Sequence, residues 1–328
     1  MFFNVLLMVF GFVLLVKGAD FLVKGASGIG RKFGLSEMII GLTIVSIGTS
    51  LPEVFITITS ANQGHSDLIL GNAIGSCICN FLLVIGIASI VRPLKVDKRI
   101  IHVHIPIGIL AMVLLIILGS IPLSGEPSTI GFVEGIILLV CTVLYIAYTM
   151  YEEKNVNHRQ GHQEDIDEYI ETKKNKEEKK LSLYMILFYI ITGVLGLKFG
   201  GDFVVDNAVI IAESFNISQT VISMTIIACG TALPEIVTSI IASRKAESDL
   251  ILGNVSGSNI LNLCLLIGLG AIIHPLEFNE SFLINVVLLI AITVTIMLIS
   301  TMDKDNIINR KKGFILVLIY IIYTIRLF

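Results

Sequence analysis

The sequence contains two long stretches that recur almost unchanged. GTSLPE at 48–53 returns as GTALPE at 230–235, and DLILGNAIGSCICN at 67–80 returns as DLILGNVSGSNILN at 249–262. Both second copies lie 182 residues after the first. A constant offset over such a length indicates a duplicated unit, so we expect the two halves of the chain to share one fold.

The composition around these stretches excludes an ordinary soluble domain. Of the 328 residues, 55% are hydrophobic and only 15% are charged, whereas a soluble domain carries about 25% charged residues. The net charge of −3 gives no reason to expect a nucleic-acid partner. The apolar start, MFFNVLLMVFGFVLLV, has neither a basic region before it nor a small-residue cleavage site. We therefore expect a first membrane helix and not a signal peptide.

Ten segments reach or approach the about 20 apolar residues that cross the hydrocarbon of a bilayer. They are 1–23, 37–61, 67–90, 100–119, 129–150, 181–206, 217–243, 249–273, 281–301 and 314–327. We therefore expect an all-α polytopic membrane protein with ten transmembrane helices. The mixed-charge segment 152–180 is too polar to form a core, which makes it a linker between a first repeat, 1–151, and a second, 181–328.

The span count and the loop charges predict how the halves are oriented. Each half has five expected spans, an odd number, so the second half enters the membrane inverted. Inverted repeats place their substrate at the repeat interface near the bilayer midplane. If both termini lie outside, every Lys and Arg except Lys17, Lys198 and Arg326 falls in an inside loop. The positive-inside rule then predicts a multi-pass plasma-membrane protein with a cytoplasmic 152–180 linker.

Glu53 and Glu235 lie within expected spans at matching positions of the two repeats. An acidic residue at the centre of a membrane helix costs about 2.5–3.5 kcal/mol. No Lys or Arg lies at similar depth in the same spans, so the carboxylates must be protonated or neutralised by a cation. A pair of neutral structural glutamic acids is the alternative to an ion site.

The neighbours of Glu53 favour a bound cation. Ser46, Thr49, Ser50 and Glu53 have the i, i+3, i+4, i+7 spacing of one helical face, and all present oxygen. Pro52 lacks an N–H and crowds the preceding turn, which frees backbone carbonyls. Freed carbonyls in a membrane need a partner, and an ion could be that partner.

The second copy of this motif keeps part of the pattern. Thr231 and Glu235 match their counterparts, and Pro234 repeats the proline. Ala228 and Ala232 stand where the first copy has hydroxyl residues. We therefore expect fewer side-chain oxygens on this side of the site.

The longer motif adds amide and hydroxyl groups spaced by four residues. They are Asn72, Ser76 and Asn80 in the first copy and Asn254, Ser258 and Asn262 in the second. An all-oxygen set suits hard cations, above all Ca²⁺, which takes 6–8 oxygens. The absence of His and Cys from the set argues against zinc or copper. Two ionised glutamates would be neutralised by one Ca²⁺ or by several Na⁺, so the site should change sides only when it is loaded.

At these four motifs the sequence resembles the Ca²⁺/cation antiporter superfamily, and within it the prokaryotic sodium/calcium exchangers. The likeness covers both repeats, the ten-span plan and the central loop. It implies a secondary active antiporter that exchanges Ca²⁺ for Na⁺ by alternating access. It also implies that Ca²⁺ is held by Glu53 and Glu235 and by the backbone carbonyls of Thr49 and Thr231.

The same resemblance implies further ligands and a motion. Na⁺ would use the Ca²⁺ ligands together with Ser50, Ser76 and Ser258, while Asn80 and Asn262 complete the central position. Spans one and six would slide against the rest of the bundle. Asn262 stands where some archaeal and potassium-dependent relatives have Asp, which argues against K⁺ co-transport.

Three alternatives remain open. A Ca²⁺/H⁺ antiporter would use the same two glutamates as proton carriers. An intramembrane enzyme using the carboxylates for acid–base work would need a nucleophile or a metal motif such as H-E-x-x-H, which the sequence lacks. A channel fits poorly with two Gly-rich repeats that leave no evident pore ring. We therefore expect no enzyme and no cofactor, with the lipid bilayer and the transported Ca²⁺ and Na⁺ as partners.

The remaining polar residues in apolar stretches have simpler interpretations. His102 and His104 are expected at the membrane interface. Asp20 and Asp202 are expected to make capping or snorkelling contacts to Lys24 or Lys198. The five cysteines are expected to be small buried residues and not disulfides or a soft-metal site.

Overall fold

The structure is a computed structural model that describes residues 2–33, 35–121, 123, 128–159, 182–215, 230, 232–302 and 305–326. It is helical almost throughout. The α-helices are α1 Phe2–Phe33, α2 Glu37–Ile40, α3 Ser46–Thr49, α4 Leu51–Asn62, α5 Ser66–Cys79, α6 Ile85–Val91, α7 Ile105–Ser120, α8 Phe132–Arg159, α10 Leu183–Ser214, α13 Leu233–Arg244, α14 Ser248–Ile260, α15 Ile267–Ile273, α16 Glu280–Thr301 and α17 Arg310–Arg326. Short π-helical segments are η1 Gly41–Val45, η2 Asn80–Val84, η3 Ile100–His104 and η5 Leu261–Leu266.

The described chain has seven helices long and apolar enough to cross a membrane. There are eight if the bent pair Glu37–Thr49 and Leu51–Asn62 forms one crossing. The helical membrane class is confirmed, but fewer crossings are found than the ten expected. The expected span 217–243 is described only at Gly230 and from Ala232 onward. The last helix, α17, has 17 residues, fewer than the about 20 that an upright crossing needs.

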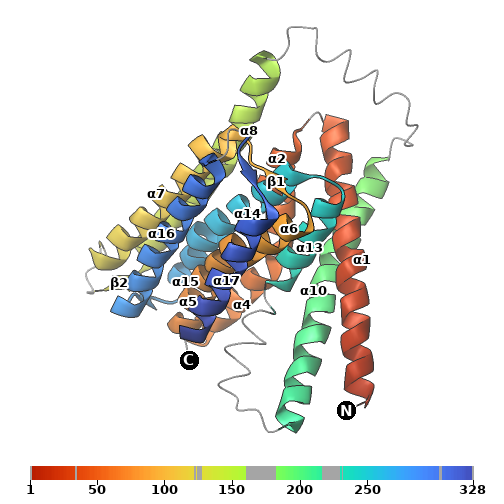
Figure 1. Ribbon diagram of the computed structural model, residues 1–328. Coiled ribbons are helices and arrows are strands. Elements are labelled where there is room, and N and C mark those ends of the chain that lie inside the picture. Colours follow the sequence, from red (N-terminus) through yellow and green to blue (C-terminus); the bar gives the residue numbers. More distant parts are fainter. Residues whose placement is uncertain are drawn as a thin grey trace.

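The first residues of the expected linker are helical. Helix α8 continues from the membrane span through Arg159 and so includes residues 152–159. The rest of the 152–180 linker lies outside the described residues. The charged residues at the end of α8 therefore extend a helix beyond the apolar bundle, as Figure 1 shows.

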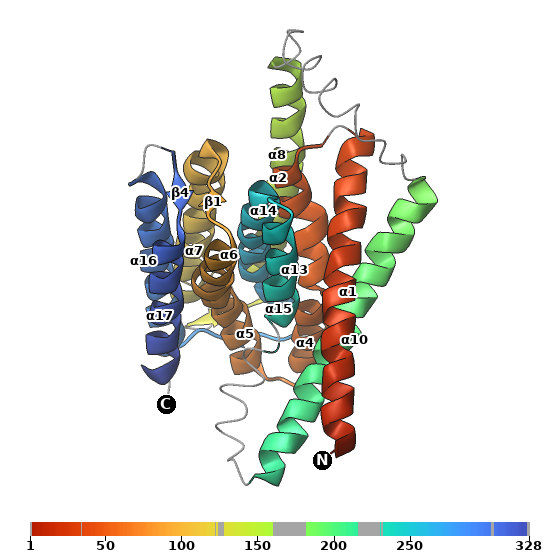
Figure 2. The same cartoon turned by 45° about the vertical axis from the view of Figure 1, so that its right-hand side comes forward.

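The two helices that carry the longer motif form the centre of the bundle. In the most apolar stretch of the span Ser66–Val91, 72% of the residues are buried, and in that of Ser248–Ile273, 78% are buried. The corresponding share in the five other single spans is between 22% and 33%. Figures 1 and 2 show α5 and α14 surrounded by other helices. Most residues of these two spans therefore lie against protein and not against lipid.

Helices α1 and α10 run side by side along one flank of the bundle (Figures 1 and 2). Glycines at seven-residue spacing on α1 lie against the backbone of α10. A Cβ atom added at Gly18 would fall 2.7 Å from the backbone nitrogen of Leu197 and 2.8 Å from the carbonyl carbon of Gly196. The two backbones are therefore in direct contact, as in small-residue membrane helix pairs.

Two short antiparallel strand pairs connect the halves of the chain. Strand β1 (Leu94–Lys95) pairs with β4 (Ile307–Ile308), and β2 (Thr129–Ile130) pairs with β3 (Leu276–Glu277). Strands β1 and β3 are separated by the repeat offset. Figure 1 shows β1 and β2 at opposite ends of the bundle, with both chain ends at the β2 end and α8 leading out at the other.

Candidate functional site

A bend in the chain places Glu53 in the first turn of α4. Ser50 (φ −85°, ψ 2°) separates α3 from α4, and the two parts of the span differ in direction by 46°. The same backbone recurs at Ala232 (φ −87°, ψ 0°) before α13, so Glu235 also lies in a first turn. The positive end of a helix dipole lies at its N-terminus, where it stabilises a negative charge. The fold therefore gives both glutamates the same electrostatically favourable position.

The expected unbroken helical face from Ser46 to Glu53 is wrong for the same reason. Pro52 has no N–H to continue the hydrogen-bond ladder, so the helix ends at Thr49 and restarts at Leu51. Ser46 and Thr49 remain on the first helix, and Glu53 is on the second. All three side chains are nevertheless buried in the protein interior.

Both carboxylates face the protein interior. Glu53 is 1% exposed and Glu235 is 2% exposed. They lie close enough to interact electrostatically. None of the ion pairs formed by the described residues includes either of them. Two acidic groups thus share one buried region without a basic side chain to neutralise them.

Glycine allows α2 and η1 to approach α14 closely. A Cβ atom added at Gly253 would meet the carbonyl oxygen of Met38, and one at Gly41 would meet that of Leu250. This backbone contact explains why a glycine stands at position 253 of the second long motif. Gly71, the counterpart of Gly253, has no described atom within 4 Å of such a Cβ. The segment 217–229, which contains the match to η1, lies outside the described residues.

The close approach brings polar side chains of the two repeats together. The Thr49 hydroxyl lies 3.3 Å from Oδ1 of Asn254, and it also lies in hydrogen-bonding range of the Glu235 carboxylate. The hydroxyl of Ser50 lies 3.3 Å from that of Ser258. The structure thus joins four of the predicted site residues in two contacts across the repeats.

The other two predicted asparagines are held by a pair of matched contacts. Nδ2 of Asn80 donates to Oδ1 of Asn259 across 3.0 Å. The side chain of Asn262 contacts the thiol of Cys77. Cys77 and Asn259 occupy equivalent positions of the two repeats, so both contacts follow one pseudosymmetric pattern. Asn80 begins η2 and Asn262 lies in η5, and π-helical turns are frequent at functional sites.

Several buried oxygens in this region have no hydrogen-bond partner among the described residues. They are Oε2 of Glu53, Oε2 of Glu235, Oδ1 of Asn80 and Oδ1 of Asn262. A buried acceptor without a donor costs about 1–3 kcal/mol. A hard cation satisfies carboxylate and amide oxygens at once. The donor set therefore fits Na⁺ or Ca²⁺ as a transported substrate.

For the remaining predicted site residues the structure gives only the burial of the side chain, or does not describe the residue. Ser76 is buried, and Asn72 is half-buried with a side-chain nitrogen that has no partner in the described chain. Thr231 lies outside the described residues. Ala232 is buried at the position matching Ser50, so the second repeat lacks that hydroxyl.

Sequence reasoning missed five residues of this region. They are Cys77, Asn259, Thr57, Thr238 and Ser239. The last three have buried hydroxyls without a partner in the described part of the chain. The sequence did contain a signal for Thr57 and Ser239, because each repeat has a hydroxyl residue four positions after its glutamate.

Two expectations concern outlying polar residues. His104 is buried within the protein, where Tyr145 lies 3.3 Å from its Nδ1 and Glu152 lies 3.5 Å from its Nε2, and its place at the membrane interface stays a prediction. Asp20 pairs with Lys245 at 2.8 Å and not with Lys24. The expected contact of Lys198 with Asp202 is present at 3.5 Å.

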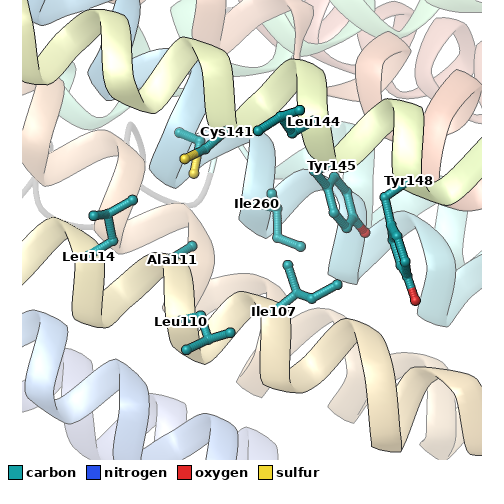
Figure 3. Close-up of a pocket in the computed structure, with 10 residues that line it drawn as sticks. Ile107, Leu110, Ala111, Leu114, Cys141, Leu144, Tyr145, Tyr148 and Ile260 are labelled. Atoms are coloured by element: carbon teal, nitrogen blue, oxygen red, sulfur yellow. The ribbon is translucent and has the colours of Figure 1, made fainter.

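A separate pocket of about 280 Å³ lies between α7, α8 and the α14–η5 junction. Figure 3 shows that its lining is apolar apart from the tyrosine hydroxyls and thiol groups, with Ile260 at its base. No carboxylate lines this pocket. This pocket is therefore distinct from the interface around the two glutamates, which is the candidate ion site.

Comparison with known proteins is consistent with this site. A model of the sodium/calcium exchanger protein family matches residues 3–151 and 185–328. The sodium/calcium exchanger MaX1 of Methanosarcina acetivorans is 30% identical over 346 residues, covering 99% of this chain and 98% of its own. The inner membrane protein YrbG of Escherichia coli is 34% identical over 249 residues, covering 76% of this chain and 73% of its own. A solved structure of the sodium-calcium exchanger NCX_Mj, soaked with Na⁺ and Sr²⁺, matches with a TM-score of 0.80 at 29% identity, covering 98% and 97% of the two chains.

Proposed function

This chain belongs to the sodium/calcium exchanger protein family, and from that premise we propose that it exchanges Ca²⁺ for Na⁺ across the membrane by alternating access. The ions would bind between Glu53 and Glu235. Two of the named relatives are sodium/calcium exchangers and the third is an inner membrane protein.

The observation that carries this proposal is the pair of buried glutamates surrounded by unpartnered oxygens. Two ionised carboxylates in the bilayer would repel each other and lack hydration. One Ca²⁺ would neutralise both, and Na⁺ ions could use the same oxygens in turn. An unloaded site would expose two charges to a poorly polar interior, so it should change sides only with ions bound.

The proposed ligands follow from the two motifs. Ca²⁺ would be held by Glu53, Glu235 and the backbone carbonyls of Thr49 and Thr231. Na⁺ would use these groups together with Ser50, Ser76 and Ser258. Asn80 and Asn262 would complete the central position, and Asn72 and Asn254 would add to the oxygen shell. The contacts of Thr49, Ser50 and Asn80 across the repeat interface support a single shared site.

The proposed architecture is ten transmembrane helices arranged as two inverted five-helix repeats, 1–151 and 181–328. The pairing of β1 with β4 and of β2 with β3 at opposite ends supports the inversion, since each pair takes one strand from each repeat. Both termini lie at one end of the bundle (Figure 1). With the Lys and Arg distribution, this supports a plasma-membrane protein with both termini outside and the 152–180 linker in the cytoplasm.

Ca²⁺ flux in proteoliposomes tests the proposal. Purified protein is reconstituted, and ⁴⁵Ca²⁺ uptake is measured first under an outward Na⁺ gradient and then under a pH gradient alone. Na⁺/Ca²⁺ exchange predicts uptake only with the Na⁺ gradient. Uptake driven by the pH gradient alone would replace this proposal with Ca²⁺/H⁺ antiport through the same two glutamates.

A further inference from the structure

Three buried hydroxyls near the glutamates lack the hydrogen bond that six other buried helical hydroxyls of the described chain make. Thr57, Thr238 and Ser239 are 0%, 1% and 1% exposed. Their hydroxyl oxygens have no hydrogen-bond partner in the described chain. A buried hydroxyl without a partner is costly, so this cluster needs a physical explanation.

The usual explanation for a buried hydroxyl in a helix does not apply to them. Such a hydroxyl normally donates to the carbonyl four residues earlier. Six buried hydroxyls of this protein do so at 2.7 to 3.1 Å: Thr43, Ser46, Thr142, Thr149, Thr293 and Ser300. Thr57, Thr238 and Ser239 do not, so their oxygens remain available to another partner.

Their positions relative to the glutamates are matched between the repeats. Thr57 follows Glu53 by four residues, and Ser239 follows Glu235 by four. Residues four apart lie on one helical face with about 5–6 Å between their Cβ atoms. Side chains in a helix lean toward its N-terminus, so each hydroxyl leans toward its glutamate.

The two helices carry these hydroxyls toward opposite ends of the bundle. Gly64, just beyond α4, lies next to His274 at the end of α15 that leads to β3. Ser243, in the last turn of α13, donates to the carbonyl of Ala88 at the end of α6 that leads to β1. Thr57 therefore lies between Glu53 and the β2–β3 end, and Ser239 lies between Glu235 and the β1–β4 end.

We propose that Thr57 on one side, and Ser239 with Thr238 on the other, form two outlying cation sites that bind a partly hydrated Na⁺ or Ca²⁺ as it approaches or leaves the glutamates. This inference rests on the proposed exchange. A neutral hydroxyl replaces one water of hydration without the strong attraction of a carboxylate. A site on a transport path must bind an ion firmly enough to receive it and weakly enough to release it.

The test measures the half-saturating Ca²⁺ concentration for transport separately at each face of the membrane. Thr57→Val and Ser239→Ala are reconstituted in phospholipid vesicles, with Ca²⁺ varied on one face at a time. Thr57→Val should raise the half-saturating Ca²⁺ concentration about three- to tenfold at the β2–β3 face alone. Ser239→Ala should do so at the β1–β4 face alone. A residue that only stabilises the fold would affect both faces equally.

Matched variants complete the test. Thr57→Ser keeps the hydroxyl and should retain the wild-type value, which tests the idea even if Thr57→Val folds poorly. Thr142→Val removes a buried hydroxyl that is bound to its own helix and should change neither face. Values that are unchanged, or equally changed on both faces, beside an active wild-type protein would overturn the outlying sites. A wild-type protein without Na⁺-driven Ca²⁺ flux would instead overturn the proposed function.

Discussion

The side-chain amide of Asn80 donates to the side-chain carbonyl of Asn259 across 3.0 Å, at the contact between the two copies of the repeat. Asn262 makes the equivalent contact to the thiol of Cys77. The Oδ1 atoms of both Asn80 and Asn262 are left without a partner in the described chain. The bond to Asn259 thus fixes the direction in which the side-chain oxygen of Asn80 points.

Removing the acceptor should therefore weaken ion binding without touching an ion ligand. Asn259→Ala frees the Asn80 amide to rotate, and the half-saturating Ca²⁺ concentration should rise about three- to tenfold because one neutral hydrogen bond is lost. Asn285→Ala is the control, since Asn285 bonds only within its own helix, to Ser281. Equal Ca²⁺ dependence of the two variants would contradict an orienting role for Asn259.

The two glutamates should be individually indispensable. Glu53→Gln and Glu235→Gln preserve shape but remove one negative charge each, so Ca²⁺ flux should fall at least about 100-fold in either variant. Both proteins should still elute as folded species, because Gln fits the same space. Glu277→Gln, on an exposed strand residue, is the control. Substantial flux in either site variant would mean that the ions bind elsewhere.

Restoring the missing hydroxyl should change the Na⁺ dependence. Ala232 has the same backbone conformation as Ser50 but no side-chain oxygen. Ala232→Ser adds one oxygen beside Glu235, and the half-saturating Na⁺ concentration should fall about two- to fivefold, while that for Ca²⁺ changes little. ⁴⁵Ca²⁺ flux across a series of Na⁺ gradients measures this. An unchanged Na⁺ dependence would place position 232 outside the Na⁺ sites.

The duplication explains why so much of the fold could be predicted. The repeated motifs identified the two central helices and the burial of Glu53 and Glu235, because a membrane leaves acidic residues few other places. The bend at Ser50 was harder to place, since a proline can kink a helix or divide it. The contact of Asn80 with Asn259 could not be predicted, because it depends on how helices far apart in the sequence cross.

The burial of His104 had a different cause. Its sequence position near the end of a span is typical of an interfacial residue. In the structure, the long helix α8 runs past that end and places Tyr145 and Glu152 against the imidazole. The length of α8 was obscured in the sequence because its last turns are charged.

The ion pair between Asp20 and Lys245 should have only a modest effect on stability. It joins α1 to the end of α13 at 2.8 Å, but its side chains are 44% and 35% exposed. Exposed pairs contribute about 0.2–1 kcal/mol. Asp20→Asn should therefore lower the thermal midpoint of unfolding slightly and change the Ca²⁺ flux less than about fivefold. A larger loss of flux, recovered by the exchange Asp20→Lys with Lys245→Asp, would show that this contact controls the transport cycle.

The contact between α1 and α10 can be tested by replacing Gly18 or Gly201 with alanine, because only the new Cβ at Gly18 would meet the backbone of the neighbouring helix. An alanine in a helix is favoured over glycine by about 1 kcal/mol at either position. At Gly18 the new Cβ would fall 2.7 Å from the backbone of Leu197, whereas at Gly201 no described atom lies within 4 Å. Gly201→Ala should therefore raise the thermal midpoint or leave it unchanged, with normal flux. Gly18→Ala should lower the thermal midpoint and reduce Ca²⁺ flux, because backbone atoms cannot move aside as a flexible side chain can.

Since the helix-propensity gain is the same in both variants, their difference isolates the backbone contact. Similar behaviour of the two proteins would mean that α1 and α10 separate easily, and that their close packing does not constrain transport.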